Sequence, residues 1–106
     1  MDKADILDKL SQVIASRKGG DTDKSYVAKL FAKGRKKIAQ KVGEEGVELS
    51  LAAVLDDKAD AVSESADLLF HMMVLWADMG ISPEEIFEEL ARREGISGID
   101  EKNARS

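Results

Sequence analysis

The chain has 106 residues, a formal net charge of −5 and no cysteine. This length suggests a single domain over residues 1–106. The absence of cysteine excludes a disulfide framework, a thiolate zinc site and a cysteine nucleophile, and it fits a cytoplasmic protein. The acidic balance argues against general affinity for nucleic acid. No run approaches the roughly 20 apolar residues that cross a bilayer, and the acidic N-terminus is not a signal peptide, so we expect no membrane partner.

Hydrophobic spacing, together with glycine, proline and capping residues, divides the chain into helices. A single proline and few strand-favouring aromatics support the same interpretation. Ser25 is expected to cap a short helix, Gly80 to end a long one, and Ser82 with Glu85 to form a capping box. The predicted helices span about 2–17, 26–32, 35–55, 58–79 and 83–95. We therefore predict an all-α bundle of four to five helices, with a polar and loosely ordered tail over 96–106.

The helix predicted over 58–79 is apolar nearly all round, which is typical of a buried helix. One narrow polar stripe interrupts it, and the residues on that stripe are Asp60, Glu64, Asp67, His71 and Asp78. On the preceding helix, the carboxylates at 44, 45 and 48 lie between two apolar flanks. Both sets of carboxylates are therefore expected to face a cavity or other polar groups.

The spacing of these carboxylates indicates a cation site. Glu45 and Glu48 are three residues apart, as are Glu64 and Asp67, so each pair points the same way from its helix. Two antiparallel helices would bring the pairs together, and each like-charge contact at about 4 Å costs on the order of 4 kcal/mol at an effective dielectric near 20. Oxygen ligands favour Mg²⁺ or Mn²⁺. On spacing alone, salt bridges to the basic residues at 35, 37 and 41 explain the pattern equally well.

A basic segment, residues 33–41, precedes the first carboxylates. Such a segment is either a solvated helix face or a clamp for phosphate groups beside a metal. His71 lies one turn beyond Asp67, and we interpret it as a support for the neighbouring carboxylates or as a buried structural histidine.

Three stretches resemble a known family: SYVAKL at 25–30, KGRKKIAQKVGEE at 33–45 and SESADLLFH at 63–71. They closely resemble the phosphoribosyl-ATP pyrophosphatases of histidine biosynthesis, and the resemblance covers about residues 5–95. The wider pattern, Glu45-x-x-Glu48 followed by Glu64-x-x-Asp67, is shared with all-α nucleotide pyrophosphohydrolases of the MazG type. Gly46 stands where the family usually has alanine.

The resemblance implies an ATP-binding hydrolase that converts phosphoribosyl-ATP and water to phosphoribosyl-AMP and pyrophosphate. It also implies a cytoplasmic location, a Mg²⁺ requirement and a helical bundle completed by homodimerisation. By this resemblance Glu45, Glu48, Glu64 and Asp67 are metal ligands and Glu44 is a nearby auxiliary carboxylate. The phosphate contacts that it implies are Lys33, Arg35, Lys37 and Lys41. As a mechanism, we expect a carboxylate not fully committed to metal, Glu44 or Glu48, to orient or deprotonate the attacking water. Two other functions stay open: a house-cleaning nucleoside triphosphate pyrophosphohydrolase with the same metal chemistry, and a non-enzymatic helical dimer.

Overall fold

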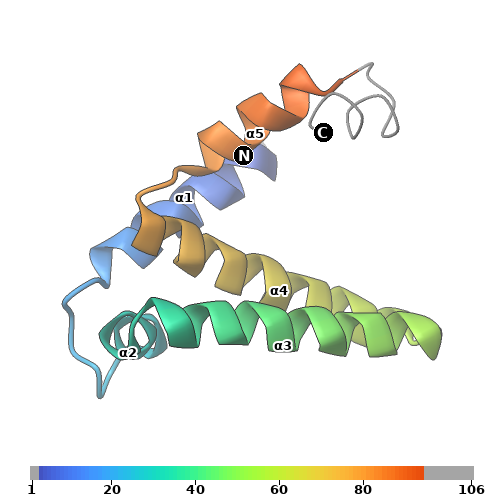
Figure 1. The fold of residues 1–106 in the computed structure, drawn as a ribbon, viewed down its shortest axis with the longest axis horizontal. Coiled ribbons are helices and arrows are strands. Elements are labelled where there is room, and N and C mark those ends of the chain that lie inside the picture. Colours follow the sequence, from blue (N-terminus) through green and yellow to red (C-terminus); the bar gives the residue numbers. More distant parts are fainter. Residues whose placement is uncertain (1–2, 95–106) are drawn as a thin grey trace.

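The computed structural model describes residues 3–94, which form five helices and no strand (Figure 1). The helices are α1 (Lys3–Ser16), α2 (Tyr26–Lys33), α3 (Arg35–Val54), α4 (Lys58–Met79) and α5 (Pro83–Arg92). The all-α prediction is confirmed, and most predicted helix ends agree within about two residues, as expected of helix boundaries. The predicted loose tail, 96–106, lies outside the described residues. None of the described helices is long and apolar enough to cross a membrane.

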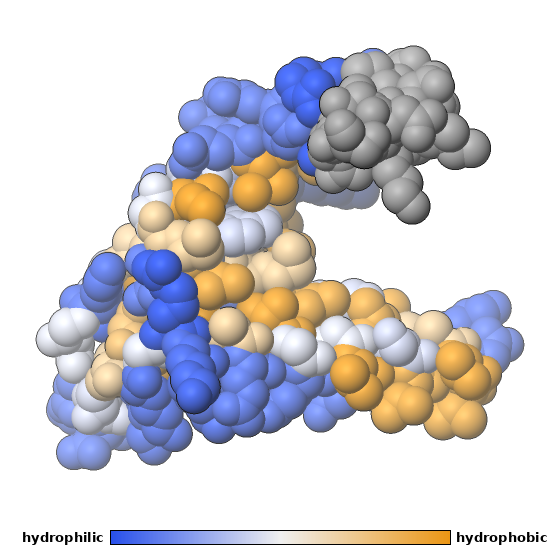
Figure 2. Space-filling view, in the orientation of Figure 1, coloured by the Kyte–Doolittle hydropathy of each residue, from blue (hydrophilic) through white to orange (hydrophobic). Residues whose placement is uncertain are grey.

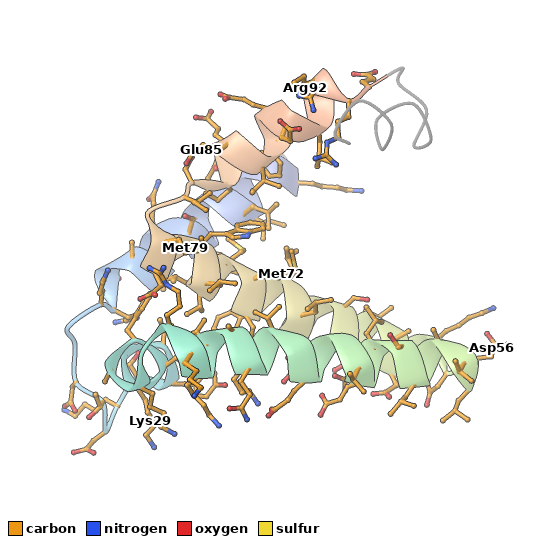
Figure 3. All side chains as sticks on the ribbon, viewed as in Figure 1. Lys29, Asp56, Met72, Met79, Glu85 and Arg92 are labelled. Carbon is orange, nitrogen blue, oxygen red and sulfur yellow. The ribbon has the colours of Figure 1, made fainter. Side chains whose placement is uncertain are left out.

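A hairpin of the two longest helices, α3 and α4, dominates the molecule (Figure 1). The short turn between them uses Asp56, which adopts a left-handed φ of 55° that aspartate tolerates better than most residues. Asp57 then caps α4, because its side chain accepts a hydrogen bond from the amide of Asp60 at 3.0 Å. Asp56 marks the tip of the hairpin, far from the end where Lys29 of α2 lies (Figure 3). The tight turn makes α3 and α4 antiparallel neighbours along most of their length.

The other predicted caps are also present. The hydroxyl of Ser25 accepts from the amide of Ala28 at 3.1 Å and starts α2. Gly80 ends α4 in a left-handed conformation with φ 74°. Ser82 and Glu85 form the predicted capping box at the start of α5. Local sequence therefore fixes where each of these helices begins or ends.

The hydrophobic core lies at the end of the molecule where α1 and α2 meet the C-terminal half of α4 and the start of α3 (Figure 1). Its fully buried side chains include Ile14 of α1, Ile38 of α3 and Val74 of α4. The buried cluster consists of Ile14, Val27, Leu30, Ile38, Met73 and Val74. This core anchors one end of the α3–α4 hairpin and leaves the other end projecting.

The projecting end of the hairpin exposes apolar side chains, visible as an orange area along α3 and α4 (Figure 2). Val62 of α4 is 72% exposed, although the sequence predicted that α4 would be buried on nearly every side. This exposure means that no other helix within residues 3–94 covers this part of the hairpin. The large apolar side chains exposed along this part of the two helices and at their turn are Val47, Leu51, Val54, Leu55, Val62 and Leu69. We call this set the hairpin stripe.

Candidate metal and catalytic site

Three carboxylates meet between α3 and α4. Glu45 and Glu48 of α3 and Glu64 of α4 each offer an oxygen atom, and these atoms lie within 4.8 Å of one another. The three-residue spacing on α3 and the antiparallel packing of α4 produce this arrangement. The predicted convergence of carboxylates from both helices is therefore present in the structure. We call these three residues the carboxylate cluster.

Two oxygen atoms of the cluster have no hydrogen-bond partner among residues 3–94. Glu45 Oε2 and Glu64 Oε2 are buried and make no hydrogen bond within the structure. A buried carboxylate oxygen without a donor carries a desolvation cost, which a bound cation would remove. An oxygen-only donor set also matches the preference of a hard divalent cation. The residues present thus fit a site for Mg²⁺ or a similar ion.

The electrostatics of Glu64 agree with this arrangement. Burial of its carboxyl group, contact with Glu48 and the negative charges of Glu48, Asp60 and Asp67 raise the pKa of Glu64 to about 7. In the absence of a cation, Glu64 is therefore close to half protonated at neutral pH. A bound cation would favour the charged carboxylate and reverse this shift.

Asp67, the fourth predicted ligand, lies outside the cluster of three. Its side chain is exposed, one turn beyond Glu64 on α4, and its charge still acts on Glu64. Asp60 lies one turn before Glu64 and acts on it in the same way. Two acidic side chains of α4 thus flank the cluster along the helix.

Lys41 lies over the α3 side of the site. Its Nζ is 3.5 Å from a carboxylate oxygen of both Glu44 and Glu45. Partial burial favours the neutral amine, but the neighbouring Tyr26, Glu44 and Glu45 outweigh it and raise the pKa of Lys41 above its usual value. Lys41 therefore stays cationic and neutralises part of the carboxylate charge. These contacts are the salt bridges that the sequence also allowed for Lys41. One oxygen atom of Glu45 still has no hydrogen-bond partner within residues 3–94.

Glu44 lies outside the carboxylate cluster. Its carboxylate accepts a hydrogen bond from Gln40 at 2.8 Å, and this bond and Lys41 lower the pKa of Glu44. Glu44 and Glu48 instead line a shallow surface hollow of about 600 Å³, together with Gln40, Gly43 and Val47. The hollow offers both carboxylates access to a solvent molecule or ligand beside the cluster.

The other three residues that the sequence predicted as phosphate contacts differ in whether a carboxylate already binds them. Arg35 is held by α4, because its guanidinium donates to Asp78 Oδ2 at 2.8 Å and to the Asp78 carbonyl oxygen at 3.0 Å. Lys33, at the end of α2, and Lys37, in the first turns of α3, make no ion pair within residues 3–94. Two of the four predicted cations are thus free to bind a ligand, and two are held by carboxylates.

His71 is buried and links α4 to α2. Its Nδ1 lies 2.7 Å from the carbonyl oxygen of Asp67, so Nδ1 carries the proton, because a carbonyl oxygen only accepts. Its Nε2 then accepts from the hydroxyl of Tyr26 at 2.8 Å. The histidine is therefore tied to the turn that carries Asp67, as its position on the polar stripe suggested.

Sequence reasoning missed the contact of Tyr26 with His71, and it placed Asp60 on the polar stripe without assigning it a role. Tyr26 is 45 residues from His71, and no spacing rule connects positions on separate helices. The four-residue spacing from Glu64 had placed Asp60 on the stripe, and the structure adds that its charge acts on Glu64.

The fold and the cluster together define an all-α protein whose paired long helices bring together carboxylates that could hold a cation. A family model described as phosphoribosyl-ATP pyrophosphohydrolase matches residues 7–94. The chain belongs to this family.

Curated relatives agree over nearly the whole chain. The phosphoribosyl-ATP pyrophosphatase of Paramagnetospirillum magneticum is 61% identical over 101 residues, 95% of this chain and 93% of the relative. The protein of the same name from Azospirillum brasilense is 60% identical over 102 residues, 96% of this chain and 92% of the relative. That from Novosphingobium aromaticivorans is 54% identical over 106 residues, 100% and 99% of the two chains.

Proposed function

We propose that this protein hydrolyses phosphoribosyl-ATP to phosphoribosyl-AMP and pyrophosphate, the second step of histidine biosynthesis, in the cytoplasm. The near full-length match to relatives named for this activity carries the proposal. The carboxylate cluster between α3 and α4 supports it, because cleavage between the α- and β-phosphates requires neutralisation of a highly charged substrate.

Magnesium is the proposed cofactor, with Mn²⁺ as a substitute. Glu45, Glu48 and Glu64 would hold the ion, with Asp67 completing the set from the next turn of α4. A bound Mg²⁺ supplies positive charge to the triphosphate and lowers the pKa of a water molecule. The unpaired oxygen atoms of Glu45 and Glu64 are the strongest support for this assignment.

Protein side chains would perform the rest of the chemistry. Glu44 or Glu48, which line the hollow beside the cluster, would orient the attacking water and accept its proton. Lys33 and Lys37 would bind non-bridging phosphate oxygens, since neither has an ion-pair partner in residues 3–94. Lys41 would hold Glu44 and Glu45 in place, and Arg35 would contact phosphate only after leaving Asp78.

A homodimer is the proposed assembly. The hairpin stripe exposes six large apolar side chains on or between the two helices that carry the cluster. A second copy packed along this stripe would bury them and complete the helical bundle.

The deciding experiment measures pyrophosphate release by the purified protein with Mg²⁺, using phosphoribosyl-ATP, ATP, dUTP and dCTP. We expect a strong preference for phosphoribosyl-ATP and complete loss of activity with EDTA. Comparable turnover of the ordinary triphosphates would instead assign the protein to the house-cleaning pyrophosphohydrolases. Absence of release from all four substrates would leave the cluster a structural feature and overturn the proposal.

A further inference from the structure

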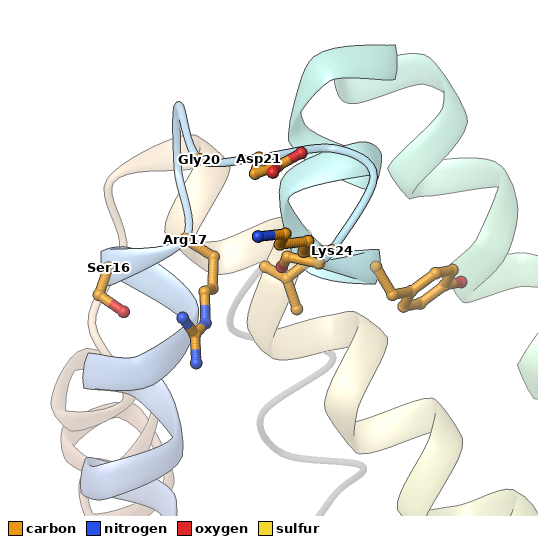
Figure 4. Close-up of a pocket in the computed structure, with 8 residues that line it drawn as sticks. Ser16, Arg17, Gly20, Asp21 and Lys24 are labelled. Carbon is orange, nitrogen blue, oxygen red and sulfur yellow. The ribbon is translucent and has the colours of Figure 1, made fainter.

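A second cavity lies outside the carboxylate cluster, between the end of α1 and the start of α2 (Figure 4). Its volume is about 500 Å³, which lies within the usual range for small-molecule sites. Its lining residues are Ser16, Arg17, Gly20, Asp21, Lys24, Ser25, Tyr26 and Val27. The proposed metal ligands, catalytic carboxylates and phosphate-binding residues are not among them.

Two cations from different elements reach this cavity. Arg17 follows α1 and Lys24 precedes α2, and Figure 4 shows their side chains on two sides of the hollow. Neither makes an ion pair within residues 3–94. The third charged residue, Asp21, uses its Oδ1 to accept from the amide of Asp23 at 2.9 Å. The two cations outnumber the one carboxylate, so the charged side chains that line the cavity leave it with a net positive charge.

The loop that carries these cations is held in place by its own hydrogen bonds. The amide of Gly20 donates to the carbonyl oxygen of Arg17 at 2.9 Å, and that of Ser25 donates to the carbonyl oxygen of Asp21 at 3.0 Å. A Cβ atom at Gly20 would approach the Arg17 oxygen to 3.0 Å, so this close turn favours glycine. Such a loop presents its cations with little ordering cost when a ligand binds.

Tyr26 connects the cavity to the proposed catalytic site. It lines the cavity, and its hydroxyl is two hydrogen bonds, through His71, from the backbone of Asp67. It also lies close enough to Lys41 to raise the pKa of that lysine. Tyr26 therefore lies between the cavity and the turn of α4 that carries Asp67.

We propose that this cavity binds the ribose 5-phosphate end of the substrate, with Arg17 and Lys24 contacting its phosphate group. This assignment rests on the proposed function, because phosphoribosyl-ATP carries phosphate groups at two ends and ATP at only one. The triphosphate would lie at the carboxylate cluster and the phosphomonoester in the cavity. Arg17 and Lys24 are then specificity residues that distinguish phosphoribosyl-ATP from ordinary nucleoside triphosphates.

The test compares Arg17→Gln, Lys24→Gln and the double variant with the unmodified protein. For phosphoribosyl-ATP we expect KM to rise about tenfold in each single variant with kcat nearly unchanged, because a charge-assisted contact to a remote phosphate contributes uniform binding. For ATP, measured as a substrate or a competitive inhibitor, we expect no change. Lys29→Gln, which removes an exposed cation elsewhere on α2, is the matched control.

Two results would overturn the inference: unchanged KM for phosphoribosyl-ATP in the double variant, or equal losses with phosphoribosyl-ATP and ATP. Calorimetric binding of ribose 5-phosphate provides a second readout that needs no turnover. Binding by the unmodified protein that is lost in the double variant supports the cavity, and absence of binding counts against it. Failure of the unmodified protein to hydrolyse phosphoribosyl-ATP would instead refute the proposed function, and the ribose 5-phosphate result would still decide the inference.

Discussion

The hydroxyl of Tyr26, at the first position of α2, lies 2.8 Å from Nε2 of His71 in the second half of α4. His71 is only 5% exposed, so its ring nitrogens depend on protein partners. Its other ring nitrogen, Nδ1, donates a hydrogen bond to the carbonyl oxygen of Asp67. These two hydrogen bonds therefore link the short helix α2 to the turn of α4 that carries Asp67, a proposed metal ligand.

Removing that hydroxyl should destabilise the fold. Tyr26→Phe leaves Nε2 of His71 buried without a donor, which should lower the free energy of unfolding by about 1–3 kcal/mol. Urea denaturation checks this value. Ser50→Ala is the control, because the Ser50 hydroxyl also makes one hydrogen bond, to the Gly46 carbonyl oxygen, but at an exposed position. We expect the control to change stability by less than about 0.5 kcal/mol. Equal stabilities of Tyr26→Phe and the unmodified protein would contradict the proposed link.

The assignment of metal ligands predicts inactive but folded variants. Glu64→Gln and Asp67→Asn each remove one charged ligand and preserve side-chain size. Because loss of a group that merely supports a ligand costs about 10- to 100-fold, loss of a ligand should lower kcat/KM by more than about 100-fold. Circular dichroism should show unchanged helix content. Glu88→Gln, an exposed carboxylate on α5, is the control and should retain full activity. Full activity in Glu64→Gln or Asp67→Asn would refute the site.

The raised pKa of Glu64 predicts how stability depends on pH without metal. The folded-state pKa is about 7, above the ordinary value of 4.5, so the folded protein binds more protons than the unfolded chain between these values. The resulting stability is fully present below about pH 4.5 and is lost as pH rises through 7.

Thermal denaturation in EDTA from pH 5 to 8 measures this contribution. Glu64→Gln removes the titrating group and is the matched comparison, and we expect its melting temperature to fall less over the same range. Added Mg²⁺ should stabilise the unmodified protein more at pH 8 than at pH 5, because protons compete with the cation. A Mg²⁺ effect that is independent of pH would argue against Glu64 as a ligand.

The sequence predicted the helices well because their ends depend on local chemistry. Ser25, Gly80 and the Ser82–Glu85 pair act within a few residues of themselves. The convergence of Glu45, Glu48 and Glu64 was also predictable, since helical spacing and one short turn determine it.

The sequence did not predict which side chains on different helices contact one another. Periodicity identifies the face of a helix on which a residue lies, but not the residue that meets it from another helix. Arg35 was therefore expected either in a salt bridge or as a phosphate contact, but its partner Asp78, 43 residues away, was not identified. For the same reason Tyr26 was recognised only as part of a motif and not as the partner of His71.

One residue of α3 offers a stabilising substitution. Glycine within a helix costs about 1 kcal/mol relative to alanine, and a Cβ atom built on Gly46 meets no atom within 4 Å. Gly46→Ala should therefore raise the free energy of unfolding by about 0.5–1 kcal/mol, measured by urea denaturation. The control is Gly80→Ala, where φ is 74° and a Cβ is strained, so we expect destabilisation. A loss of stability in Gly46→Ala would show that α3 has a neighbour at this position in solution.

The hairpin stripe predicts a dimer that one charge should disrupt. Leu51 is 58% exposed in the single chain, so Leu51→Glu costs little in a monomer but places a charge in the proposed interface. Leu90→Glu on α5 is the matched control, because Leu90 has a similar exposed fraction of 61% and lies outside the stripe. Light scattering after size-exclusion chromatography should find dimers of the unmodified protein and of Leu90→Glu, and monomers of Leu51→Glu. A monomeric unmodified protein, or a Leu51→Glu variant that remains dimeric, would show that the stripe is not the interface.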